Sequence, residues 1–175
     1  TLFLKTKGYS PAFLGRARYG IFLSIKRSIQ KNDQHLILMS PYTILDLVNI
    51  VTAAKGIPEY FDLNDNIYSF YPSLKYFEKK ISSKRYSAVI ITHYHLNYKF
   101  SRQLRKICTR YNTSLIEDCA IAYGSTYDNG KHVGLNADFS IFSNSLFKFS
   151  NYLWGGFIHS KNKSDTNYFN YHLSK

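Results

Sequence analysis

Long apolar runs are missing from this sequence, and so is an apolar segment at its N-terminus. No stretch approaches the roughly 20 residues that a membrane-spanning helix needs. The longest apolar runs, residues 35–39 and 88–91, have the length of buried strands. Residues 1–5 include neither an initiator Met nor the core of a signal peptide. We therefore expect no membrane insertion and a cytoplasmic location, and the missing Met also suits a piece of a longer protein.

Cysteine and acidic residues are scarce as well. The two cysteines, Cys108 and Cys119, have neither metal-ligand spacing nor a disulfide framework, so we interpret them as reduced thiols. Asp and Glu number 11 against 23 Lys and Arg, which leaves a net charge of +12. Such an excess is compatible with a nucleic acid or another acidic partner. Because the basic residues are scattered, we interpret most of them as solvated and predict no nucleic-acid partner.

Apolar segments alternate between strand-like and helix-like patterns along the chain. Strands are expected over residues 35–39, 58–62, 86–92, 113–117, 138–142 and 156–160, and helices over 16–31, 43–54, 72–82 and 98–111. The polar tail at 161–166 reads as a loop. This alternation predicts a three-layer αβα fold with a mostly parallel central sheet. Ligands of such sheets bind beyond the carboxyl ends of the strands.

Three of these strand ends carry suggestive residues, at 40–43, at 117–119 and at 142–143 leading to Lys148, and the last two are suited to cofactor chemistry. Asp118 is placed to pair with a pyridinium nitrogen, or to cap a helix that begins at residue 120. Ser143 offers a hydroxyl to a phosphate. Lys148 lies between Phe147 and Phe149, and an apolar setting favours the neutral amine that forms a Schiff base. A lysine taken alone is more often a surface residue.

Taken together, these residues resemble the DegT/DnrJ/EryC1/StrS family of sugar aminotransferases that depend on pyridoxal phosphate (PLP). Residues 116–120, Ile-Glu-Asp-Cys-Ala, are similar to the family's "ieDcAqa" segment. The spacing of Ser143, Lys148 and Gly155-Gly156 matches the family's serine, Schiff-base lysine and glycine pair. Upstream, residues 36–43 are similar to "vivPsyT". The resemblance extends over about residues 12–160.

The resemblance implies the large domain of an aspartate-aminotransferase-like fold over residues 1–175, without the family's C-terminal small domain. PLP would be held by Lys148 through a Schiff base, by Asp118 at the ring nitrogen, and by Ser143 at the phosphate. The backbone of Arg16 and Ala17, at a helix N-terminus, would complete the phosphate site. The implied partners are a keto-sugar nucleotide, glutamate as amino donor and a second copy of the chain. The implied pathway is surface-polysaccharide or amino-sugar biosynthesis.

Departures from the family pattern leave the activity open. Ile121 stands where the family has Gln or His, and Ile44 stands where it has a ring-stacking aromatic, for which Tyr42 is a neighbouring substitute. The alternative is therefore a truncated or degenerate relative with a binding or structural role. For this chain alone we expect cofactor binding with little turnover. Trp154 and the aromatic tail at 168–171 are candidates for an exposed docking surface.

Overall fold

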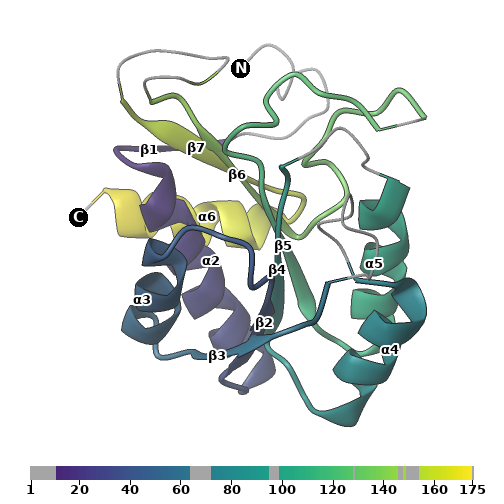
Figure 1. Ribbon diagram of the computed structural model, residues 1–175. Helices are drawn as coiled ribbons and strands as arrows, with labels where there is room; N and C mark the ends of the chain where they lie inside the picture. Colours follow the sequence, from purple (N-terminus) through teal and green to yellow (C-terminus); the bar gives the residue numbers. More distant parts are fainter. Residues whose placement is uncertain are drawn as a thin grey trace.

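The computed structural model describes residues 11–63, 72–94, 99–127, 129–145, 148 and 154–174. Within them, one sheet has the strand order β1-β7-β6-β5-β4-β2-β3 (Figure 1). The strands are β1 (Ala12–Leu14), β2 (Leu36–Met39), β3 (Ile57–Tyr60), β4 (Ala88–Thr92), β5 (Ser114–Asp118), β6 (Phe139–Ser143) and β7 (Gly156–Ser160). The helices are α2 (Ala17–Asn32), α3 (Asp46–Ala53), α4 (Leu74–Ser83), α5 (Lys99–Arg110) and α6 (Lys163–Leu173).

The central strands of the sheet are parallel. β3, β2, β4, β5 and β6 pair in parallel, whereas β7 runs antiparallel to both β6 and β1. The predicted αβα fold with a mostly parallel sheet is therefore confirmed. The carboxyl ends of β4, β5 and β6 consequently meet at one edge of the sheet.

Helices cover both faces of the sheet (Figure 1). Alternate residues of each strand supply the two cores, because successive side chains point to opposite faces. Ile90 and Ile116 pack towards α2, α3 and α6, and Val89 and Leu115 pack towards α4 and α5. Among the described residues, no helix is both long enough and apolar enough to cross a bilayer.

The C-terminal tail corrects one expectation. Instead of a loop, residues 163–173 form α6, whose first turn is capped by the Asn162 side chain accepting from the Ser164 N–H at 2.9 Å. Phe169, expected on an exposed surface, is buried with its ring 5.5 Å from that of Phe139. Asp165 is buried too, and binds Arg27 at 2.7 Å and Lys31 at 2.9 Å on α2. These contacts dock α6 against the sheet.

Candidate functional site

A pocket of about 440 Å³ opens at the carboxyl edge of the parallel strands. Its walls come from the N-terminus of α2, the loop after β2, the ends of β4 and β5, and the connection from β6 to β7. The lining residues are Arg16, Ala17, Arg18, Ile21, Ile44, Thr92, Tyr94, Asp118, Ala120, Ile121, Ser143, Ser145, Lys148, Trp154 and Gly155. Segments more than a hundred residues apart in sequence therefore build one cavity.

Most of the residues singled out in the sequence line this pocket. Lys148, Asp118 and Ser143 do so, together with Arg16, Ala17, Ile44 and Ile121. Tyr42 does not line the pocket. It packs edge-to-face on Tyr94, which does, with ring centroids 5.3 Å apart. Phe147 and Phe149, the expected apolar flanks of Lys148, lie outside the described residues.

Asp118 provides a buried carboxylate in the pocket wall. Burial raises its pKa, and the Ala120 N–H at 3.1 Å and the positive charges of His93 and Lys148 offset only part of that effect. A turn rather than a helix follows Asp118, so the helix-capping interpretation does not hold. A cation bound in the pocket would supply the compensation that this carboxylate lacks.

Another part of the pocket is suited to an anion. Arg16 is the N-cap of α2, its side chain makes no capping hydrogen bond, and the first turn of the helix contains no acidic residue. The first N–H groups and the positive end of the helix dipole therefore favour negative charge here. Ser143 Oγ and Ser145 Oγ, 3.0 Å apart, add two hydroxyls.

The glycine pair at the start of β7, Gly155 and Gly156, is required for two separate reasons. Gly155 has a φ of +97°, a conformation that L side chains rarely adopt. A Cβ on Gly156 would lie 2.3 Å from the Phe142 carbonyl oxygen. Because Ser143 is paired with Gly156 in the register of β6 and β7, this close approach sets the backbone that carries Ser143.

Two aromatic residues line the pocket that sequence reasoning did not place there: Tyr94 was not singled out, and Trp154 was named only as part of an exposed docking surface. Tyr94 comes two residues after β4, and burial raises the pKa of its phenol. Trp154 is 75% exposed and lies at the return of the chain to β7. The available signal for Tyr94 was its position, because it follows a buried strand whose neighbour in the parallel sheet ends at Asp118.

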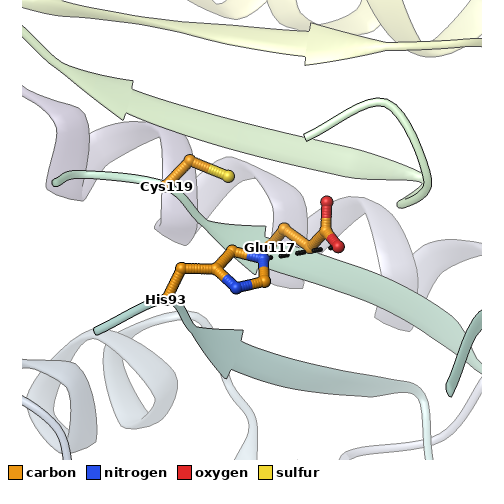
Figure 2. A group of neighbouring side chains, drawn as sticks. All are labelled: His93, Glu117 and Cys119. Carbon is orange, nitrogen blue, oxygen red and sulfur yellow. Dashed lines mark ion pairs between the residues drawn. The ribbon is translucent and has the colours of Figure 1, made fainter. Parts of the chain in front are cut away.

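A second cluster lies on the other face of the same strand ends. The side chains of His93, Glu117 and Cys119 approach one another there, with ligand-type atoms within 4.8 Å (Figure 2). His93 Nε2 is 3.4 Å from Glu117 Oε1, and both side chains are almost fully buried. Residues 92, 94, 118 and 120 line the pocket, so the alternating residues 93, 117 and 119 face away from it.

Hydrogen bonds already occupy the carboxylate of this cluster. The Tyr127 hydroxyl donates to both oxygens of Glu117 at 3.0 and 3.1 Å, and Ser101 Oγ donates to Oε1. Burial raises the pKa of Glu117, but the hydrogen bonds from His93, Ser101 and Tyr127 outweigh it and lower the pKa overall. Zinc accepts imidazole, carboxylate and thiolate ligands. Since Glu117 is engaged and burial holds the Cys119 thiol protonated with a raised pKa, we assign a hydrogen-bond network here.

Solved structures similar to this chain include sugar aminotransferases. Helicobacter pylori PseC, an aminotransferase of pseudoaminic acid biosynthesis, superposes with a TM-score of 0.80 at 18% identity, over 97% of this chain and 46% of that one. A GDP-4-keto-6-deoxymannose-3-dehydratase holding a trapped PLP-glutamate geminal diamine gives 0.80 at 15% identity, over 96% of this chain and 44% of that one. At these identities the likeness shows the fold.

The chain belongs to the DegT/DnrJ/EryC1/StrS aminotransferase family, whose model matches residues 19–168. Among curated proteins, GDP-perosamine synthase of Vibrio cholerae is 28% identical over 141 residues, which are 81% of this chain and 36% of that protein. This chain therefore spans less than half the length of the relatives that it matches.

Proposed function

We propose that this chain is the PLP-binding large domain of a nucleotide-sugar aminotransferase that takes its amino group from glutamate. The observation that carries the proposal is the convergence of Lys148, Asp118 and Ser143 on one pocket at the carboxyl edge of the sheet. The pocket has the size usual for a cofactor site, about 300–1,000 Å³.

The chemistry of the pocket fits PLP. A buried, undercompensated carboxylate would suit a cationic ring nitrogen, an amine lies in the same cavity, and two hydroxyls at the N-terminus of α2 would suit a phosphate. Tyr94 offers an aromatic wall in a pocket where Ile44 cannot stack as an aromatic ring does. Bound PLP supplies an electron sink for bond breaking at the substrate carbon.

Each residue then has a task of its own. Lys148 Nζ would anchor the cofactor, and its free amine would move a proton to or from the substrate carbon. Asp118 would keep a proton on the ring nitrogen, because a carboxylate stabilises the cationic form. Ser143 and the amides of Arg16 and Ala17 fix the phosphate and thereby orient the ring.

The anchor is tested by labelling. The purified chain is mixed with PLP, followed by visible absorbance, reduced with borohydride, digested and mapped by mass spectrometry. We expect the label on the peptide that contains Lys148, and its loss in Lys148→Ala. Lys131→Ala removes an exposed lysine outside the pocket and is the matched control. Equal labelling of several lysines, or none at Lys148, contradicts the proposal.

The substrates and the assembly are part of the proposal. GDP-perosamine synthase and the GDP-sugar dehydratase are named for nucleotide sugars, which supports a substrate of that class for this chain. Lys148 favours amino transfer over the dehydration branch, which has histidine at that position. Three exposed apolar residues around the pocket, Trp154, Ile44 and Leu45, support a homodimer with the site at its interface. The cytoplasm is the proposed location of this homodimer. Sedimentation with PLP bound tests the dimer.

The second candidate is a non-catalytic relative that binds the cofactor or a partner. It is favoured by Ile121, a side chain without hydrogen-bonding capacity that lines the pocket where the family pattern has Gln or His. Adding glutamate to the PLP-loaded chain separates the two functions. Conversion of the cofactor to its amine form at about 1 per second or faster supports the enzyme. Retention of the visible band without conversion supports the binding role.

A further inference from the structure

The ends of β4 and β5 carry the pocket on one face and the His93 cluster on the other. The register pairs Thr92 with Asp118, and the His93 backbone N–H donates to the Asp118 carbonyl at 3.0 Å. His93 is thus joined directly to the residue that faces the pocket. Its side chain lies on the opposite face, where its Nε2 is 3.4 Å from Glu117 Oε1 (Figure 2).

Glu117 is itself held from two directions. Ser101 on α5 and Tyr127 in the segment after β5 both donate to its carboxylate. Tyr127 also accepts from the Gly134 N–H at 3.0 Å, which ties the cluster to the loop before β6. A buried carboxylate with this many donors has little rotational freedom, so the imidazole beside it is fixed as well.

We propose, on the basis of the proposed function, that His93 is a positioning residue for Asp118. Clamped by Glu117, it fixes the strand end that carries the Asp118 carboxylate and supplies positive charge behind it. His93 touches neither pocket nor cofactor, and acts only through Asp118.

The electrostatics of the described groups agree with this role. The positive charge of His93 lowers the pKa of Asp118, against the larger, raising effect of burial. The charged and titratable groups around Asp118 are Lys148, Arg16, Arg18 and Tyr94 on the pocket side, and His93, Glu117 and Cys119 behind it. Of these, His93 and Lys148 lower the pKa of Asp118. The amine of Lys148 is the one that would be used in the covalent bond to the cofactor.

The experiment measures PLP affinity against pH, by visible absorbance, in wild type and in His93→Gln. Glutamine keeps a donor for Glu117 but cannot carry charge. We expect the acid limb of PLP binding to move to higher pH by about one to two units, because Asp118 then holds its proton to higher pH. The loss of affinity should therefore grow as the pH falls and shrink above the midpoint. A purely structural role would lower affinity equally at every pH.

Two further variants keep the test decisive. His35→Gln makes the same change at an exposed histidine that precedes β2, at the opposite edge of the sheet, and should leave the midpoint unchanged. Glu117→Gln removes the carboxylate charge that lies 3.4 Å from His93 Nε2, and should shift the midpoint in the same direction as His93→Gln.

Each outcome has one meaning. A folded His93→Gln or Glu117→Gln protein with the wild-type midpoint overturns the inference while the proposed function stands. Failure of both variants to fold, with His35→Gln folded, makes the cluster structural and also overturns it. If the wild type binds no PLP at Lys148, the proposed function fails first and the inference fails with it.

Discussion

Replacing Gly156 by alanine tests how closely the pocket depends on one backbone contact. The added Cβ would lie 2.3 Å from the Phe142 carbonyl oxygen, well inside the 3.0 Å that real Cβ contacts respect, and 3.3 Å from the Ala17 Cβ. Neither obstacle is a flexible side-chain end, so β7 must move away from β6. Overpacking of this kind costs about 1–3 kcal/mol, and each weakened ladder hydrogen bond adds about 0.5–1.5 kcal/mol. We expect a loss of about 2–4 kcal/mol, or about 5–15 °C in Tm for a chain of this size.

Two other glycines calibrate the measurement. Gly15→Ala has no atom within 4 Å of the new Cβ and no positive φ, so its unfolding free energy should stay within about 0.5 kcal/mol of wild type. Gly124→Ala meets open space but sits at a φ of +83°, which should cost about 1–2 kcal/mol. Urea unfolding, monitored by circular dichroism, measures the order of stability of the three variants. A Gly156→Ala midpoint equal to that of Gly15→Ala, or above that of Gly124→Ala, refutes the reasoning.

Further outcomes follow from other contacts. Tyr94→Ala should weaken PLP binding about 3- to 10-fold by removing an aromatic wall, which an absorbance titration measures; unchanged affinity means that the ring does not stack. Asp165→Ala should cost about 2–3 kcal/mol of unfolding free energy, because it leaves Arg27 and Lys31, two partly exposed cations, without their carboxylate partner. A urea midpoint equal to wild type contradicts this. Burial raises the thiol pKa of both Cys108 and Cys119, so Ellman's reagent should react with neither until denaturant is added, and a fast-reacting thiol in the native chain would disagree. Burial lowers the pKa of His159 to about 4. The unfolded chain therefore takes up that proton first as the pH falls below about 6.5, and stability should decline from there towards pH 4. A His159→Gln protein should lose less between pH 7 and pH 5 in urea titrations, and an identical loss rules His159 out.

The elements that the sequence pattern could predict are the strands whose side chains are buried on both faces of the sheet. β7 falls at residues 156–160 as expected, because an apolar strand between a glycine pair and a polar loop leaves little choice. Elements held mainly by distant partners were missed. α6 contains few apolar residues, and its docking depends on Phe169 and on an ion pair to a helix more than 130 residues earlier. β1 has three residues and exists through its pairing with β7.

The candidate site divides in the same way. Lys148, Asp118 and Ser143 could be named because their intervals follow a family pattern, and the structure brings them to one pocket. Tyr94 was marked in the sequence only by its position after a buried strand, which does not by itself place it in a pocket. Its place depends on β4 lying beside β5 in register. Tyr42, named as the aromatic substitute, lies one layer further out and contacts Tyr94 instead of lining the pocket.

The pleat at the end of β5 has a consequence for how this gene can change. Glu117 and Asp118 are encoded by adjacent codons, yet their side chains point to opposite faces of the sheet. The surroundings therefore make Glu117 a stronger acid, with a lowered pKa, and Asp118 a weaker one, with a raised pKa. Deleting a single codon earlier in β5 would turn both side chains to the other face of the sheet, so that the Asp118 carboxylate would point away from the pocket and the Glu117 carboxylate away from its donors. Both the site and its support would be lost in one event.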